Sequence, residues 1–228
     1  MAKKLYRKET FSSEQDWLDA RAFGGSSASA ILGKNPYMSK LELYKAIINP
    51  KVKKVSKLSE NMAYGIKCES LIRKEFILDY QDIYKVHTPR AHEMYRRIEK
   101  PYLTATLDGI LVDKRTHQKG ILEIKTHDIR NKEDARNWRT KLPENYYIQV
   151  IHYLMVMNDY QFVVVAAKLR YFNYFEEGGK KLLKSETIYH YIDRKEVSDQ
   201  IVALEKAETD FWENNVKKKI IPAVKIEF

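Results

Sequence analysis

The chain has 228 residues, of which 41 are Lys or Arg and 31 are Asp or Glu, so its formal net charge is +10. Apolar residues make up 44% of the sequence, enough for a sizeable core and too many for a disordered chain. The longest apolar run, 162–167, is far shorter than the ~20 residues that span a bilayer. A single cysteine, Cys68, excludes a disulfide scaffold and any zinc or iron–sulfur site built from a set of cysteines.

The basic balance favours a polyanionic partner, with nucleic acid first and a membrane surface second. No apolar stretch follows the charges at the N-terminus, so we expect no secretory signal. The single cysteine favours a reduced, intracellular location.

The first half of the chain is predicted to be mainly helical. Residues 1–12 are basic and polar and are expected to form an arm or an edge segment. Short helices are predicted over 13–22, 27–32 and 39–48, the first with Ser13 as its N-cap, with turns at 24–27 and at Asn35-Pro36. The lysine-rich segment 49–57 is expected to be an exposed loop. A long helix is predicted over 60–80 from the apolar spacing of Leu71, Ile72, Phe76 and Ile77.

The second half alternates strands with helices. Strands are predicted within 84–97 and over 102–113 and 120–127, the last two joined as a hairpin by the turn 114–119. Residues 128–145 are polar and basic; a helix over 146–157, strands over 162–171 and 186–193, and a closing helix over about 195–216 follow. We therefore expect one α/β domain.

Acidic and basic side chains interrupt two of the predicted apolar strands. Asp108 lies in one strand, while Glu123 and Lys125 lie in the next and point to the same face, because side chains alternate along a strand. A hairpin centred near 116–117 places Asp108 opposite about Lys125, within a residue or two. Glu69, in the long helix, reaches that face if the helix packs on it.

This set of residues has two interpretations. Carboxylates and backbone carbonyls are hard oxygen ligands that suit Mg²⁺ or Mn²⁺, and Lys125 would add positive charge beside a phosphate. The alternative is a structural Asp108 before Gly109 and a surface ion pair between Glu123 and Lys125. The apolar surroundings of all three residues favour the first.

Several motifs follow one another in a specific order: Trp17–Arg21, Gly24–Tyr37, Gly65-x-x-x-Glu69, Asp108-Gly109, Glu123-Ile124-Lys125-Thr126 and Tyr146–Tyr153, with Phe211-Trp212 and Pro222 near the end. In this order and spacing they resemble the PD-(D/E)XK nucleases, and more narrowly the YqaJ-like viral recombinase family that includes lambda exonuclease. Two departures are Leu107 in place of the proline before the metal-binding Asp and a slightly short segment between Arg21 and Ser26.

The resemblance implies a restriction-endonuclease-like core in which helices flank a central mixed β-sheet. It implies a single nuclease domain over 1–228, with an N-terminal helical, phosphate-binding part (1–60), a catalytic core (61–193) and a C-terminal helix and tail (194–228). The implied activity is Mg²⁺-dependent digestion of one strand of double-stranded DNA, processively from an end in the 5′→3′ direction, with Mn²⁺ as a possible substitute.

The resemblance also implies roles for particular residues. Asp108 and Glu123 would bind the metal, the Ile124 carbonyl would be a third ligand, Glu69 would be a second-site or outer ligand, and Lys125 would be the catalytic cation. Residues expected to line the site or bind phosphate are Gln149, Tyr153, Arg21 and one of Ser26, Ser27 and Ser29, of which Ser26 fits the spacing to Gly33 best.

The implied partners are DNA ends, two further copies in a homotrimeric ring, and a single-strand annealing protein that acts in homologous recombination. The implied location is the cytoplasm of a bacterial host, with the gene carried by a phage or prophage, and no membrane is involved. A structure-specific or RecB-like endonuclease of the same fold is one alternative, although many RecB-like nucleases carry an iron–sulfur cysteine set that is absent here. A catalytically silent DNA-binding protein is the other.

Three further residues have open interpretations. The six histidines show no tight metal spacing, and His152 is expected at the surface or behind the site. Trp138, among Arg136 and Arg139, would either stack on DNA or anchor a loop. Cys68 is expected to be a small apolar residue in a packed helix.

Overall fold

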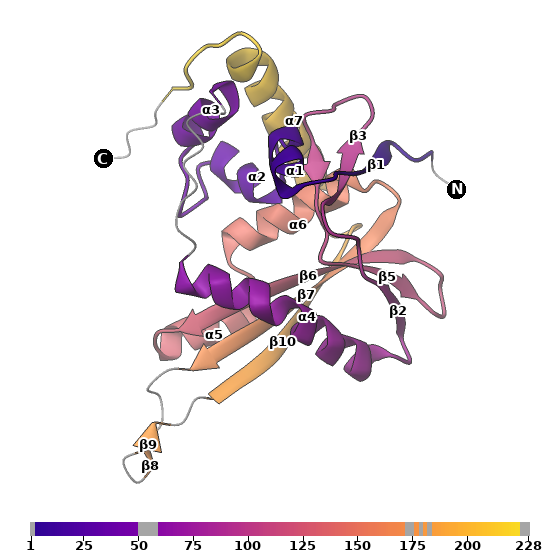
Figure 1. The fold of residues 1–228 in the computed structure, drawn as a ribbon, viewed down its shortest axis with the longest axis vertical. Helices are drawn as coiled ribbons and strands as arrows, with labels where there is room; N and C mark the ends of the chain where they lie inside the picture. The colour runs from indigo at the N-terminus through magenta and orange to yellow at the C-terminus, as the bar shows by residue number, and fades with distance from the viewer. Residues whose placement is uncertain (1–2, 50–58, 172–175, 178–179, 182–183, 224–228) are drawn as a thin grey trace.

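A five-stranded mixed β-sheet forms the centre of the protein (Figure 1). The computed structural model describes residues 3–49, 59–171, 176–177, 180–181 and 184–223. In spatial order the strands are β10 (Lys184–Asp193), β7 (Tyr160–Tyr171), β6 (Lys119–Ile129), β5 (Gly109–Asp113) and β2 (Tyr84–His87). Neighbouring strands are antiparallel except β6 and β7, which are parallel and therefore need a crossover. The crossover contains α5 (Lys132–Thr140) and α6 (Glu144–Val156).

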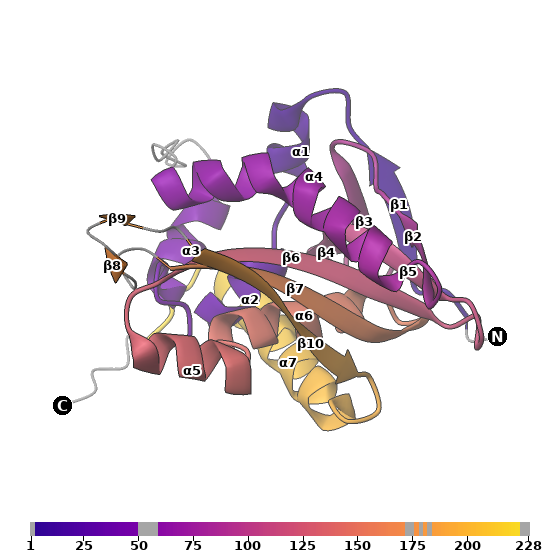
Figure 2. The same cartoon turned by 90° about the horizontal axis from the view of Figure 1, so that it is seen from below.

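Helices cover both faces of this sheet, as Figure 2 shows. The helix α4 (Glu60–Tyr80) packs on one face, where its Ile72 and Phe76 are buried against Leu122 and Ile124 of β6. On the other face α5 contacts β6 and α6 contacts β7. Because side chains alternate along β6, residues 123 and 125 point away from the α4 face and toward α6.

A second, three-stranded sheet lies beside the first. Its order is β1 (Tyr6–Thr10), β3 (Glu93–Arg97), β4 (Thr104–Ala105), all antiparallel, so the predicted N-terminal edge segment is confirmed. The predicted continuous strand 102–113 is wrong, because β4 pairs in this sheet whereas β5 pairs in the central one. Asp108 lies at the bend just before β5. Residues 176–177 and 180–181 form a separate two-stranded ribbon, β8 (Glu176–Glu177) and β9 (Lys180–Lys181).

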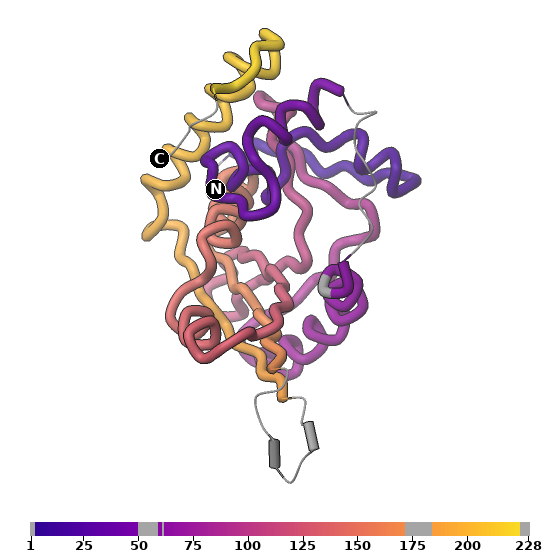
Figure 3. Tube along the Cα trace, turned by 90° about the vertical axis from the view of Figure 1, so that its left-hand side faces the viewer, coloured from indigo at the N-terminus to yellow at the C-terminus, as the bar shows by residue number. Residues whose placement is uncertain are grey.

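The remaining helices are α1 (Glu14–Ala20), α2 (Gly25–Ile31), α3 (Lys40–Ile48) and α7 (Ser198–Phe211), which continues into a π-helical turn over Trp212–Val216. Contacts join α2 to α7 and α3 to the π-helical turn, in the upper half of the molecule as drawn in Figure 3. Side chains cap four helices, namely Ser13 for α1, Ser39 for α3, Ser59 for α4 and Asn131 for α5. None of the described helices is long and apolar enough to cross a bilayer.

Three sequence predictions need correction, and a fourth is not tested. The predicted turn 24–27 is wrong, since Gly24 is the N-cap and α2 begins at Gly25. Helix α5 lies in the segment that was predicted only as polar and basic, and its Trp138 is 2% exposed, so this ring anchors the segment and does not stack on DNA. On α4, Leu71 and Ile77 are exposed. The predicted lysine-rich loop 49–57 lies outside the described residues apart from Asn49.

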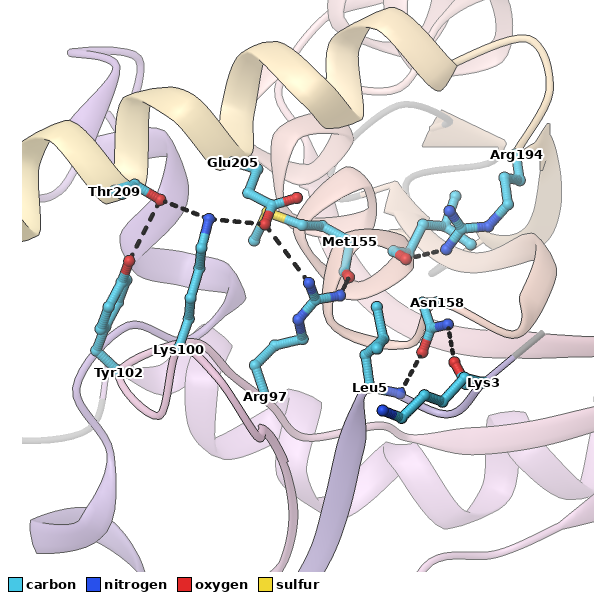
Figure 4. A network of polar contacts seen from close by, with 11 residues as sticks. Lys3, Leu5, Arg97, Lys100, Tyr102, Met155, Asn158, Arg194, Glu205 and Thr209 are labelled. Carbon is cyan, nitrogen blue, oxygen red and sulfur yellow. Dashed lines mark hydrogen bonds and ion pairs between the residues drawn. The ribbon is translucent and has the colours of Figure 1, made fainter.

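Two guanidinium groups hold the C-terminal end of α6 (Figure 4). Arg97 Nη1 donates to the Met155 carbonyl at 3.1 Å, and Arg194 Nη2 donates to the carbonyls of Leu154 and, at 3.0 Å, Met157. Cations at this end satisfy carbonyls that have no intrahelical partner and interact favourably with the helix dipole. These contacts fix the axial position of α6, which carries residues of the candidate site.

Candidate active site

Asp108 and Glu123 lie next to each other where β5 ends. The last pair of the β5–β6 ladder is Gly109 with Leu122, so the next step along the same register brings residue 108 beside residue 123. The predicted pairing of Asp108 with about Lys125 is therefore two residues off, which is within the stated range. Because β5 stops here, the Ile124 N–H has no ladder partner on this side and donates to Asp108 Oδ2 at 2.7 Å.

Both carboxyl groups are desolvated. Glu123 is 2% exposed. Burial, and then the charge of Glu123, raise the pKa of Asp108 well above its usual range, and burial raises the pKa of Glu123 against the opposing effect of Lys125. The Glu123 Oε2 atom is buried and accepts no hydrogen bond from the described residues. An unpartnered carboxylate oxygen beside a second carboxylate is unfavourable unless a proton or a cation binds there.

Lys125 points to the same side as Glu123, as the strand alternation predicts. Its Nζ lies 2.5 Å from Glu123 Oε1 and 4.9 Å from the centre of the Tyr146 ring. Burial opposes the charged form, but the charges of Glu123 and Asp108 outweigh it and raise the pKa of Lys125. The side chain is therefore an ammonium in this arrangement, not a base with a lowered pKa.

Gln149 and Tyr153 come from α6 and complete the same cluster. Gln149 Nε2 donates to Glu123 Oε1 at 2.7 Å and to the Tyr153 hydroxyl at 2.8 Å. Their spacing of four places both on one face of the helix. The structure thus brings together Asp108, Glu123, Lys125, Gln149 and Tyr153 from three separate elements.

Glu69 lies on α4 close enough to affect the pKa of Asp108, but its carboxylate pairs with Arg73 one turn along the helix. Arg73 Nε in turn donates to the Asp108 carbonyl at 2.8 Å, so this arginine links α4 to the bend before β5. Arg73 was not predicted as a site residue from the sequence, although the spacing of Glu69 and Arg73 is that of a helical ion pair. Gly65 permits the close approach of α4, since a Cβ there would lie 3.1 Å from Thr126 Oγ1.

The candidate phosphate-binding residues lie near the same region. The Arg21 guanidinium stacks over the Trp17 ring at 4.6 Å and makes no ion pair with any described residue. Burial lowers the pKa of Arg21, and the nearby Tyr153 has the opposite effect. A Cβ on Gly25 would lie 2.6 Å from both Gln149 Cγ and Tyr153 Cε1, so α2 packs directly on the cluster.

The three candidate serines differ in availability. Ser29 is 1% exposed, and its hydroxyl donates to the Ser26 carbonyl and accepts from Asn35, so it is already engaged. Ser26 is exposed and Ser27 is half-buried, and their hydroxyls make no hydrogen bond within the described chain. Ser26 and Ser27 are therefore the two available candidates.

A divalent cation fits the donor set formed by Asp108 and Glu123. Both side chains offer hard carboxylate oxygens, and the unpartnered Glu123 Oε2 has the desolvated position that a cation would stabilise. Within the described ranges no three His, Cys, Asp or Glu side chains converge on one point, and Glu69 is held by Arg73. This sparse set resembles the usual ligation of Mg²⁺, which keeps several waters.

The structure also shows the positions of His152 and Cys68. His152 is fully buried behind the cluster, where Nδ1 lies 2.8 Å from Glu208 Oε1 and Nε2 lies 2.8 Å from the Thr104 carbonyl. It is therefore not a surface residue. Cys68 is half-buried and packs on the apolar cluster beneath α4, as expected.

Comparison with known proteins places this chain in a family. The model of the YqaJ-like viral recombinase domain matches residues 16–160. The YqaJ protein of Bacillus subtilis (strain 168), described as uncharacterized, is 30% identical over 226 residues. That match covers 97% of this chain and 62% of the length of YqaJ.

Solved structures share the fold at low sequence identity. The crystal structure of an alkaline exonuclease, LHK-Exo, from Laribacter hongkongensis matches with a TM-score of 0.57 and 14% identity, covering 91% of this chain and all of that one. LHK-Exo in complex with dAMP matches with a TM-score of 0.55, 15% identity and the same coverage. The predicted fold, a central mixed sheet flanked by helices in the PD-(D/E)XK arrangement, is thereby confirmed. The family match over more than half of the chain shows that this protein belongs to the YqaJ-like viral recombinase domain family.

Proposed function

We propose that this protein is a metal-dependent deoxyribonuclease that degrades one strand of linear double-stranded DNA from an end. The observation that carries the proposal is the desolvated pair Asp108 and Glu123 with Lys125 beside it and one carboxylate oxygen unpartnered. Membership of the YqaJ-like family and the fold shared with an alkaline exonuclease support it. The net charge of +10 suits binding to a duplex backbone.

Asp108 and Glu123 would hold the cation, with the Ile124 carbonyl as a third ligand and Glu69 as an outer one. A bound Mg²⁺ (or Mn²⁺) polarises a phosphoryl oxygen and lowers the pKa of a coordinated water. Gln149 orients the Glu123 carboxylate through its hydrogen bond to Oε1. Lys125 presents its ammonium where negative charge develops on the phosphate.

Arg73 and Arg21 have supporting roles in this proposal. Arg73 fixes the backbone of Asp108 through its carbonyl, which keeps the carboxylate turned toward β6. Arg21, free of an ion pair within the described residues, would bind a phosphate of the DNA end together with Ser26 or Ser27. A guanidinium suits this because it contacts phosphate through two parallel hydrogen bonds.

Further features of the function are proposed because of the similarity to the YqaJ-like family. They comprise a single nuclease domain over 1–228, 5′→3′ and processive digestion, a homotrimeric ring around the duplex, and a single-strand annealing partner in homologous recombination. A cytoplasmic location in a bacterial host and a phage or prophage origin belong to the same proposal. Light scattering tests the ring, and a monomer mass at working concentration would contradict it.

Linear and closed circular duplexes of the same sequence test the reaction type. We expect Mg²⁺-dependent loss of the linear duplex and an intact closed circle, because digestion must begin at an end. Cleavage of the closed circle would identify a structure-specific endonuclease of the same fold instead. Binding to DNA without any cleavage would identify a catalytically silent protein.

A further inference from the structure

The ammonium group of Lys125 is held from two sides. One side is the ion pair with Glu123 Oε1 at 2.5 Å, and the other is the face of the Tyr146 ring, with Nζ 4.9 Å from the ring centre. That distance lies within the range of a cation–π contact. A lysine side chain has four rotatable carbon–carbon bonds, so a single ion pair leaves the position of its charge poorly defined.

Tyr146 is itself held in place by other rings. Its ring centre lies 5.7 Å from that of Trp138, which is 2% exposed, and Trp138 lies 4.9 Å from the His127 ring. His127 Nε2 lies 3.0 Å from Asp134 Oδ2, and the same oxygen accepts the Arg130 N–H at 3.0 Å. The row of three rings therefore runs from the site to the start of α5, where a carboxylate fixes its far end.

Helix α5 supports the Tyr146 ring from behind. It contributes no side chain to the cluster around Asp108 and Glu123. Its buried Trp138 instead supports the ring that faces Lys125, and its Asp134 fixes the ring behind Trp138. The contact with Lys125 involves the ring face of Tyr146, because a cation over an aromatic face is attracted to the π system and not to the hydroxyl.

We propose that Tyr146 is a positioning residue that holds the Lys125 ammonium between its ring face and Glu123, with Trp138 and His127 as its support. The inference rests on the proposed nuclease function, in which the place of this positive charge beside the scissile phosphate determines the rate. Electrostatic stabilisation of developing charge requires a donor that is already in position. Loss of the ring should therefore lower kcat, with little change in KM for DNA ends.

Two variants separate the ring from the hydroxyl. Tyr146→Phe keeps the ring face and is expected to retain kcat within about twofold, whereas Tyr146→Leu keeps an apolar side chain without the ring and is expected to lose about tenfold. The matched control is Tyr147→Leu, since Tyr147 is the half-buried neighbour that lines a separate groove with Lys141 and His190. This control is expected to stay near the wild-type rate.

A double variant shows whether Tyr146 acts through Lys125. In a Lys125→Ala background, Tyr146→Leu should cause no further loss of the residual activity, because the group that the ring positions is already gone. An equal tenfold loss in both backgrounds would overturn the proposal. A loss in Tyr146→Phe as large as in Tyr146→Leu would overturn it as well, since the hydroxyl would then be the active group.

Chemical labelling gives a readout that does not depend on DNA cleavage. Reductive methylation of the native protein with formaldehyde and a borane, followed by peptide mass spectrometry, reports how freely each lysine reacts. We expect Lys125 to react slowly in the wild type and in Tyr146→Phe, and several-fold faster in Tyr146→Leu. Equal labelling of Lys125 in all three proteins would contradict the proposed contact. A wild type that degrades no DNA but shows this labelling pattern would refute the proposed function alone.

Discussion

His152 on α6 and Glu208 on α7 form a pair with no solvent contact directly behind the candidate site. The Nδ1 atom of His152 lies 2.8 Å from Glu208 Oε1, and its Nε2 lies 2.8 Å from the Thr104 carbonyl. Both ring nitrogens therefore face acceptors, an arrangement that suits a doubly protonated, positively charged ring. The pair fixes α6 between Gln149 and Tyr153 against α7.

Removal of one partner should lower the free energy of unfolding more than removal of both. We expect Glu208→Leu to lower the free energy of unfolding by about 3–5 kcal/mol, because an imidazolium would be left buried without its counter-charge. The double variant His152→Leu with Glu208→Leu should cost less than either single change. Urea denaturation of the four proteins checks this, and strictly additive losses would contradict the charged pair.

The same pair should make stability depend on pH. Burial lowers the pKa of His152, but the charge of Glu208 and the hydrogen bonds to Glu208 and Thr104 outweigh it and raise the pKa above the ordinary value. Because the pKa of His152 is raised in the folded protein, its protonation contributes to the free energy of unfolding. This contribution is complete below the pKa of the unfolded chain, about 6.5, and is lost as pH rises through the pKa of the folded protein. The stability advantage of the wild type over the double variant should therefore shrink as pH rises above about 6.5. A stability advantage of the wild type that grows with pH would contradict a raised pKa of His152 in the folded protein.

Gly25 should tolerate no side chain. A Cβ there would lie 2.6 Å from Gln149 Cγ and from Tyr153 Cε1, so Gly25→Ala must displace residues of the site. We expect a loss of about 1–3 kcal/mol in stability, together with a clear fall in kcat. Gly33→Asn is the control at the other end of α2, because Gly33 has open space and φ +71°, which asparagine adopts readily. Its activity should remain close to that of the wild type.

Gln149 should matter through the orientation of Glu123. Gln149→Ala removes the hydrogen bond to Glu123 Oε1 and leaves a buried carboxylate with fewer donors. Because hydrogen bonds to charged groups contribute about 1.5–3 kcal/mol, we expect kcat to fall roughly tenfold to a hundredfold. Tyr153→Phe removes only the hydroxyl that accepts from Gln149 and should have a smaller effect. Unchanged kcat in Gln149→Ala would contradict this role.

The sequence sufficed to find the carboxylate pair because its signals are local. Alternation along β6 predicted Glu123 and Lys125 on one face, and the pairing expected across the hairpin predicted Asp108 close to them. The register was two residues off because the turn runs from Asp113 to Gln118, with His117 in the left-handed region at φ 58°. Loop length and conformation fix hairpin register, and the turn residues alone did not specify them.

The features that the sequence did not show depend on contacts between distant segments. The His152–Glu208 pair joins residues 56 positions apart, and Arg73 reaches a backbone carbonyl 35 positions away. Helix α5 was missed because most of its residues are polar and only Ala135 and Trp138 are buried. The division of 102–113 between two sheets likewise follows from strand pairing that periodicity cannot reveal.

Asp108 and Glu123 are proposed to support Mg²⁺-dependent hydrolysis from a DNA end. The most direct measurement uses an end-labelled linear duplex, with a 5′ phosphate or a 5′ hydroxyl, incubated with and without Mg²⁺ for the wild type and for Asp108→Asn. Folding of the variant is checked by its thermal unfolding. We predict degradation by the wild type with Mg²⁺ only, faster on the 5′ phosphate, and none by a folded Asp108→Asn. Undiminished degradation by Asp108→Asn, or degradation by the wild type in the presence of a chelator, would contradict a metal-dependent role of the two carboxylates.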